Sequence, residues 1–163
     1  MLIGVMADSH DHLTALEAAV KLFSERGVGF VIHAGDFVAP FSLSPMEALK
    51  CPWIGVFGNN DGEHKGLIRR SKGRIQPPPF DLNLDGKKVT VVHELTDEDR
   101  RRMDVEGTQI AIHAHTHQPS VESVGKVLYV NPGELSGWLY KRRTVAFIDT
   151  EGLKATIEDL ALP

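Results

Sequence analysis

Short apolar runs separated by polar turns recur along the chain and predict buried β-strands. In the first half of the chain these runs alternate with helical spacing, in which apolar residues return every three to four positions and Gly27 ends the helix. Ser44 and Pro45 predict the start of a further short helix over 45–49. The predicted strands are Leu2–Ala7, Val28–His33 and Trp53–Phe57, and the helical face carries Leu13, Leu16, Ala19, Val20 and Phe23.

The pattern changes after Pro77–Pro79, because consecutive prolines cannot continue a helix or a strand. Asp85–Gly86 joins two of the following segments into a predicted hairpin. Thr96 and Asp99 resemble a capping box and so predict the start of a helix. The predicted elements are the hairpin strands Phe80–Leu84 and Lys87–Val92, the helix Thr96–Val105, and the strands Gln109–Ile112, Ser120–Val124, Val127–Val130, Arg143–Ile148 and Ala155–Asp159.

This order of elements predicts an α/β fold in which two packed, mixed β-sheets are flanked by helices. Strands that alternate with helices form parallel units, whereas successive strands without helices between them pair mostly antiparallel. We therefore expect parallel pairing in the first half and mostly antiparallel pairing in the second. The chain has no internal repeat and no linker-like segment, so we expect residues 1–163 to form a single domain.

Composition narrows the class of protein. The chain is 42% hydrophobic and 25% charged, which is ordinary for a globular protein, and its net charge of −4 argues against general binding of nucleic acid. A single cysteine, Cys51, excludes an internal disulfide and suits a reducing compartment. Met1–Ala7 lacks a basic leader, and no apolar stretch reaches the roughly 20 residues that span a bilayer. We expect a cytoplasmic protein with no membrane association.

Five of the apolar runs end, within a few residues, in side chains that bind metals. Ligands gather at the carboxyl ends of the strands in open α/β sheets, so these side chains should meet at one rim. We therefore predict a metal site. The donor groups that follow the runs are Asp8 with His10, Asp36, Asn59 with Asn60 and Asp61, His93, and His113 with His115 and His117.

Each of these motifs has a simpler explanation when it is taken alone. Asp36 after Gly35 can be an ordinary turn aspartate, and His93 can be a hydrogen-bonded histidine at a strand end. The run His113–His117 is the hardest to explain by packing, because three histidines alternate just past an apolar strand. Imidazole suits zinc, copper, iron and nickel, and carboxylates extend the choice to manganese and magnesium. The combination of five such turns favours a metal site over five unrelated turns.

The ordered set of motifs resembles the calcineurin-like metallophosphoesterases, and most closely their small single-domain phosphodiesterase branch. The resemblance runs from Leu2 to about Ile148. It rests on Asp8-x-His10, Gly35-Asp36, Gly58-Asn59-x-Asp61, His93, His115-Thr116-His117 and the downstream turn Asn131-Pro132-Gly133.

The resemblance implies two divalent cations, with Mn²⁺ as the first expectation and Ni²⁺, Fe²⁺, Zn²⁺ or Mg²⁺ as alternatives. It implies hydrolysis of a small phosphate ester, with a diester as the first expectation, by a water that bridges the two ions. Asn60 would donate a hydrogen bond to the phosphate, and Asp61 would orient a ligand or a water. The implied ligands are Asp8, His10 and His117 for one ion, Asn59, His93 and His115 for the other, and Asp36 between them.

The chain departs from the family pattern at several positions. Asn60 stands where many members carry histidine, and an amide cannot act as a general acid. Asp11, Glu94 and Ala114 stand where glycine is usual, although none of these changes removes a ligand. The loss of the histidine leaves open a second hypothesis, a non-catalytic scaffold of the same fold that binds a protein partner.

The sequence says less about the substrate and about self-association. Three aromatic residues, Phe37, Trp138 and Tyr140, either line the mouth of the site or belong to the core, and the core is the commoner role for aromatics near glycine turns. The strands of the second half leave open a homo-oligomer.

Overall fold

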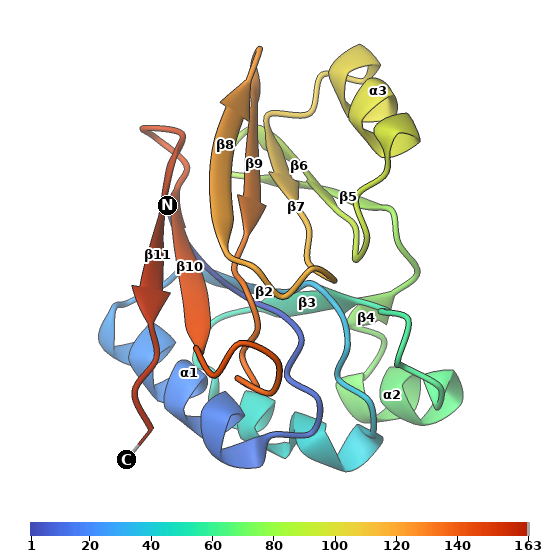
Figure 1. Cartoon of the computed structure of the whole chain (residues 1–163), viewed down its shortest axis with the longest axis vertical. Coiled ribbons are helices and arrows are strands. Elements are labelled where there is room, and N and C mark those ends of the chain that lie inside the picture. Colours follow the sequence, from blue (N-terminus) through green and yellow to red (C-terminus); the bar gives the residue numbers. More distant parts are fainter. Residues whose placement is uncertain (163) are drawn as a thin grey trace.

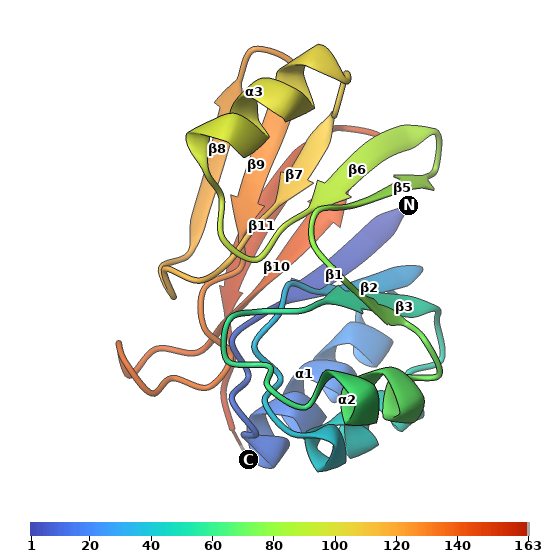
Figure 2. The same ribbon diagram turned by 90° about the vertical axis from the view of Figure 1, so that its right-hand side faces the viewer.

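A computed structural model describes residues 1–162 as two β-sheets packed face to face, with helices on the outer faces (Figures 1 and 2). The strand order is β11-β10-β1-β2-β3-β4 in the first sheet and β5-β6-β7-β9-β8 in the second. The predicted α/β class with two mixed sheets is confirmed. In chain order the elements are β1 (Leu2–Met6), α1 (Leu13–Glu25), β2 (Phe30–His33), the 3₁₀ helix η1 (Pro40–Ala48), β3 (Trp53–Val56), α2 (His64–Ser71), β4 (Ile75–Gln76), β5 (Phe80–Leu84), β6 (Lys87–Val91), α3 (Asp97–Val105), β7 (Ile110–Ile112), β8 (Ser120–Val124), β9 (Val127–Asn131), β10 (Thr144–Asp149) and β11 (Lys154–Asp159).

Alternation along the strands divides the core into layers. In β1, Ile3 and Val5 point into the core between the sheets, whereas Met6 belongs to the layer beneath α1 and η1. Gly4 lies on the α1 side, where an added Cβ would approach the ring of Phe23 to 2.8 Å, so its lack of a side chain lets α1 pack closely. On the far side of the molecule, Met103 of α3 packs against the outer face of the second sheet.

The pairing of the strands brings the carboxyl ends of five strands toward one rim. Strands β1, β2, β3 and β4 pair in parallel, as expected for the first half. The expectation of mostly antiparallel pairing in the second half is confirmed, since β5–β6, β8–β9, β1–β10 and β10–β11 pair antiparallel. The exceptions are β6–β7, where α3 crosses over between the two strands, and β7–β9, which both pair in parallel. The chain then returns to the first sheet, where β10 pairs antiparallel with β1.

The local predictions differ from the structure in a few places. The short helix expected over 45–49 is a 3₁₀ helix that begins earlier, at Pro40. Helix α2 and the two-residue strand β4 were not predicted, because α2 is largely polar and its buried residues are only Leu67 and Ser71. The capping box of Thr96 and Asp99 is present at the start of α3. None of the helices among residues 1–162 is long and apolar enough to cross a membrane.

Candidate metal centre

Tight turns at the ends of β1, β2 and β7 carry most of the predicted ligands. Asp8, His10 and Asp36 adopt positive φ angles of 50°, 42° and 60°, and His115 and His117 adopt 69° and 61°. A positive φ is uncommon for residues other than glycine, although aspartate and histidine adopt it more often than most, and such backbone conformations concentrate at functional sites. The turns are tied together by the backbone, since the amide of Asp8 donates to Gly35 and that of His10 donates to Asp36.

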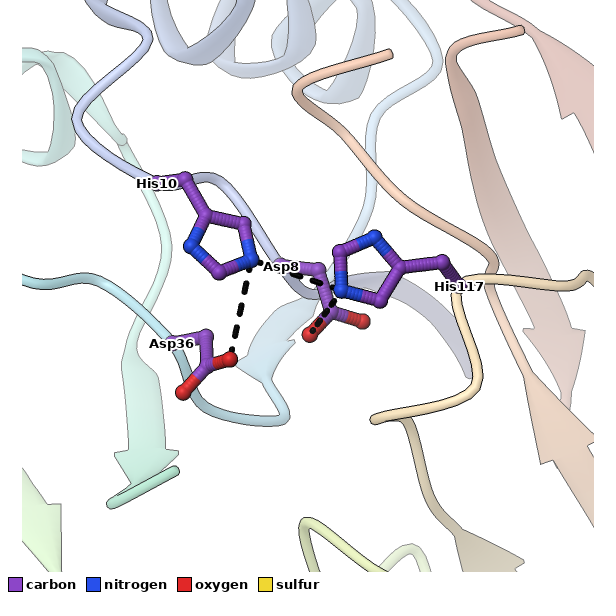
Figure 3. Close-up of side chains that lie close together, drawn as sticks. All are labelled: Asp8, His10, Asp36 and His117. Atoms are coloured by element: carbon purple, nitrogen blue, oxygen red, sulfur yellow. Dashed lines mark hydrogen bonds and ion pairs between the residues drawn. The ribbon is translucent and has the colours of Figure 1, made fainter. Parts of the chain in front are cut away.

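Four of the predicted ligands form a first group, consisting of Asp8, His10, Asp36 and His117. One ligand atom from each lies within 4.8 Å of the others. The Nε2 atoms of His10 and His117 are 3.4 Å apart, His10 Nε2 lies 3.6 Å from Asp36 Oδ2, and His117 Nε2 lies 3.6 Å from Asp8 Oδ1. Figure 3 shows the two rings and the two carboxylates directed toward a common centre. This is the arrangement of donors that a cation requires.

Asp8 is the residue whose surroundings most clearly lack a partner. Both carboxylate oxygens are buried and find no hydrogen-bond partner among residues 1–162. Burial raises the pKa of Asp8 to about 7, against the opposing effect of His117 and His93. A buried carboxylate without a partner is costly, and a bound cation removes that cost. The residues therefore fit a metal ion.

A second group is formed by Asn59, His93 and His115. The side-chain oxygen of Asn59 lies 2.9 Å from His93 Nε2 and 2.9 Å from His115 Nδ1. His93 donates through Nδ1 to the carbonyl of Ala34 at 2.8 Å, which leaves Nε2 directed at the group. Burial would lower the pKa of His93, but the hydrogen bonds to Asp36 and Ala34 and the charge of Asp36 outweigh it and raise that pKa.

Asp36, a member of the first group, also lies beside the second group. Its Oδ2 atom is 3.6 Å from His10 Nε2 and 3.5 Å from His93 Nε2, one histidine from each group. Burial acts to raise its pKa, but hydrogen bonds from His93 and Asn60 hold the pKa well below its usual range. Asp36 is therefore an anion at neutral pH, in the position from which one carboxylate reaches both groups.

Asp61 holds these turns in place. Its Oδ2 atom accepts from the backbone amides of Asp36 at 3.0 Å and Gly58 at 2.8 Å, and its Oδ1 atom accepts from Val38 at 2.7 Å. Burial raises the pKa of Asp61, and the backbone donors oppose that shift. The carboxylate thus fixes the turn that presents Asp36 and the turn that presents Asn59.

Two glycines permit the close approach of these turns. At Gly58 an added Cβ would lie 2.2 Å from Asp36 Oδ1, and at Gly35 it would lie 2.6 Å from His93 Nδ1. Both distances are far below van der Waals contact. Glycine is therefore required at both positions for steric reasons.

Glu134 belongs to the site, and the sequence reasoning did not identify it. Its side chain is fully buried, and its Oε2 atom accepts from His117 Nδ1 at 3.0 Å. The same carboxylate accepts from the backbone amides of Leu139 and Tyr140. A histidine ligand held in this way through its other nitrogen keeps one tautomer, with Nε2 toward the metal. The signal in the sequence was the position of Glu134 directly after the turn Asn131-Pro132-Gly133.

Other histidines in the chain have roles outside the two groups. His33 is fully buried, lies 2.9 Å from the hydroxyl of Ser9 and stacks on Phe37. His12 accepts from the amide of Ala15 and so caps α1. His113 lies outside the first group although it precedes two predicted ligands, and its Nδ1 atom is 3.5 Å from the side-chain amide of Asn131.

The three aromatic residues considered for the mouth of the site divide between the two expected roles. Phe37 is fully buried in the core, whereas Trp138 and Tyr140 are each 52% exposed. Trp138 stacks on the ring of His12, and Tyr140 accepts from Gln118, the residue after His117. These two aromatics therefore lie beside segments that carry ligands.

Comparison with known proteins places the chain in a family. The sequence model of the calcineurin-like phosphoesterase superfamily domain matches residues 1–153. Phosphodiesterase MJ0936 of Methanocaldococcus jannaschii is 35% identical over 156 residues, which are 93% of this chain and 94% of that protein. A solved structure described as a novel archaeal phosphodiesterase is 32% identical with a TM-score of 0.88, covering 98% of this chain and all of that one.

A more distant neighbour shares the fold alone. Vps29 of Chaetomium thermophilum superposes with a TM-score of 0.71 at 13% identity, covering all of this chain and 98% of that one. The match of the family's sequence model, the 35% identity and the order of the ligand turns agree. The chain belongs to the calcineurin-like phosphoesterase superfamily.

Proposed function

We propose that the protein is a phosphodiesterase that works with two divalent cations. Asp8, His10 and His117 would hold one cation, Asn59, His93 and His115 would hold the other, and Asp36 would bridge them. The observation that carries this proposal is the buried, unpartnered carboxylate of Asp8 beside His117. The second group supports it, because Asn59 presents one oxygen to two imidazoles at 2.9 Å.

The chemistry divides between the cations and the chain. Two cations, when bound, would lower the pKa of a coordinated water and neutralise charge on the phosphate. Asp36 stays ionised because His93 and Asn60 stabilise its charge. Glu134 orients His117, and Asp61 fixes the turns of Asp36 and Asn59. Asn60 would contribute a hydrogen bond near the phosphate, from a side chain that here donates to Asp36.

The choice of a diester and of Mn²⁺ rests on different grounds. Phosphodiesterase MJ0936 and the archaeal phosphodiesterase structure, both above 30% identity, support a diester. The mixture of imidazole, carboxylate and amide donors suits Mn²⁺, with Ni²⁺, Fe²⁺, Zn²⁺ and Mg²⁺ as further candidates. We propose Mn²⁺ as the working metal.

The decisive experiment measures hydrolysis of bis(4-nitrophenyl) phosphate and of 4-nitrophenyl phosphate by metal-stripped protein titrated with Mn²⁺. Metal content is measured in parallel on the same samples. We expect diester cleavage to rise as two ions bind per chain, and His93→Ala to lose one ion together with the activity. Circular dichroism of the variant controls for unfolding. Diester cleavage that persists without any divalent cation contradicts the proposal.

One observation supports a second candidate function, a scaffold that binds a protein partner. The side chain at position 60 is an asparagine, and its amide is already engaged with Asp36 at 2.7 Å. An amide cannot act as a general acid, so the side chain at this position supplies no proton to a leaving group. Two bound ions without turnover of either ester would favour this scaffold.

We also infer that residues 1–163 form one domain in the cytoplasm and act on a small phosphate ester rather than on nucleic acid. The family match over residues 1–153 supports one domain, and the free Cys51 suits a reducing compartment. We propose that any homo-oligomer forms through the edge strand β8, because all five of its residues are exposed.

A further inference from the structure

A cavity adjoins the second group of predicted ligands. It has a volume of about 370 Å³ and lies between the end of β3, the prolines before β5 and the segment between β6 and α3. Asn59 and His93 form part of its wall, so the cavity opens directly onto the donors of the second group. Small-molecule sites in proteins begin at about 300 Å³. A cavity of this size has room for one organic group of an ester whose phosphate lies over the ligands.

The walls of this cavity are flat and largely apolar. The ring of His64 stacks on Phe57 with centroids 4.0 Å apart and an angle of 21° between the planes. Pro78, Pro79 and Val92 form the other apolar surfaces. Flat apolar walls favour a planar organic group, because stacked and offset rings bury area in preferred geometries.

The charged groups of the cavity are acidic. Glu94 and Asp99 line it, and no lysine or arginine does so among the residues that the structure describes. Glu94 is exposed and makes no ion pair within residues 1–162. The local field therefore repels a second anion and attracts a cation.

We propose that this cavity binds an organic group of the phosphodiester and that Glu94 selects neutral or cationic groups over anionic ones. The inference rests on the proposed phosphodiesterase function and adds the class of substrate. The substrates would be diesters of an amine-bearing or uncharged planar alcohol, and esters that carry a further phosphate or carboxylate would be poor substrates. Glu94 acts here through its charge, and the ring of His64 forms part of the cavity wall that the organic group contacts.

Three symmetrical diesters test this assignment, because either of their identical groups can enter the cavity. They are bis-aryl phosphates whose rings carry a para trimethylammonium, tert-butyl or carboxylate group. Trimethylammonium and tert-butyl have the same shape, so their comparison isolates charge. The readout is the ratio of kcat/KM for the cationic diester to that for the anionic one. Comparing this ratio between wild type and variant cancels the intrinsic reactivity of the esters.

Glu94→Lys should lower this ratio about tenfold, mainly through KM, because two units of charge change beside the bound group. Glu98→Lys makes the same change of charge outside the lining and should alter the ratio less than twofold. His64→Ala should raise KM for the tert-butyl diester about fivefold and change kcat less. Metal content is measured on every variant, and Glu94→Gln replaces the lysine variant if lysine beside His93 lowers it.

The outcomes separate this inference from the proposed function. If the esters are hydrolysed but Glu94→Lys and Glu98→Lys change the ratio of kcat/KM equally, then the effect is one of overall charge. That result overturns the cavity assignment and leaves the proposed function standing. An unchanged KM in His64→Ala also overturns it. Absence of turnover with all three esters and with bis(4-nitrophenyl) phosphate overturns both.

Discussion

Asn60 holds both oxygens of Asp36: its side-chain amide donates to Oδ2 at 2.7 Å, and its backbone amide donates to Oδ1 at 2.8 Å. These bonds, with those of His93, keep Asp36 ionised although it is 1% exposed. The residue expected to contact the phosphate is therefore also the residue that orients the carboxylate between the two groups of ligands. The site depends on this pair for its shape.

Replacing Asp36 with asparagine should abolish turnover while leaving the fold intact. The variant keeps nearly the same volume but loses the charge within reach of His10 and His93. We expect kcat/KM for a diester to fall at least about a thousandfold, since a neutral amide stabilises two cations poorly. Asp104→Asn, an exposed position on α3, is the matched control. Near-wild-type turnover in Asp36→Asn would rule out the two-cation mechanism.

Replacing Glu134 with glutamine tests how far the histidine ligand depends on its own partner. The change removes the negative charge of the carboxylate whose Oε2 atom accepts from His117 Nδ1 at 3.0 Å. We expect Mn²⁺ affinity or activity to fall about 10- to 100-fold, the usual cost of losing such a partner. Ser136→Ala removes one donor to the same carboxylate and should have a smaller effect. Equal effects in the two variants would show that Glu134 only supports the loop.

The affinity for Mn²⁺ should depend on pH through Asp8. In the cation-free protein the pKa of Asp8 is raised to about 7, so below pH 7 the carboxyl holds a proton that a metal must displace. Asp8 alone should therefore lower affinity by up to about tenfold for each pH unit below 7 and have no effect well above it. The pKa of His93 is also raised, so its protonation weakens Mn²⁺ binding at low pH as that of Asp8 does. The pKa of His10 is lowered.

Isothermal titration calorimetry at pH 6, 7 and 8 checks this dependence. Runs in two buffers that differ in ionisation enthalpy count the protons released as Mn²⁺ binds. We expect proton release at pH 6 that declines by pH 8, and less release in Asp8→Asn. An affinity that stays constant from pH 6 to pH 8 would contradict the raised pKa.

The fold and most of the candidate site could be predicted because short segments of the sequence determine both. Each predicted ligand follows an apolar run, and parallel pairing of β1, β2 and β3 places the ends of those runs together. The family resemblance then sorted the donors into two groups. The distances of 3.4–3.6 Å in the first group and 2.9 Å in the second are consistent with that assignment.

The parts that the sequence did not predict depend on contacts between distant segments. Glu134 reaches His117 only because the chain leaves β9 and turns back across the site before β10. No local pattern in the sequence predicts that β10 returns to the first sheet, because the residues of an antiparallel strand alternate in the same way in either sheet. Helix α2 was missed because its polar sequence buries few side chains, Leu67 among them.

Two glycines four residues apart give the sharpest test of the steric argument. At Gly58 an added Cβ would lie 2.2 Å from Asp36 Oδ1 and 2.5 Å from the backbone nitrogen of Asp36, so the turn must shift. At Gly62 an added Cβ meets no atom within 4 Å. Gly58→Ala should lower the free energy of unfolding by about 1–3 kcal/mol, as overpacking does. Gly62→Ala should change it little, or raise it by up to about 1 kcal/mol through the entropy of the unfolded chain.

Urea unfolding of both variants in a chelator measures this effect without a contribution from bound metal. The same displacement should also reach the ligands, because Gly58 adjoins Asn59 and its amide donates to Asp61. We therefore expect Gly58→Ala to bind Mn²⁺ more weakly than wild type and Gly62→Ala to bind it normally. If the two variants unfold at the same urea concentration, then the turn around Gly58 adapts to a side chain. The close approach of Gly58 to Asp36 would in that case not determine the position of the carboxylate.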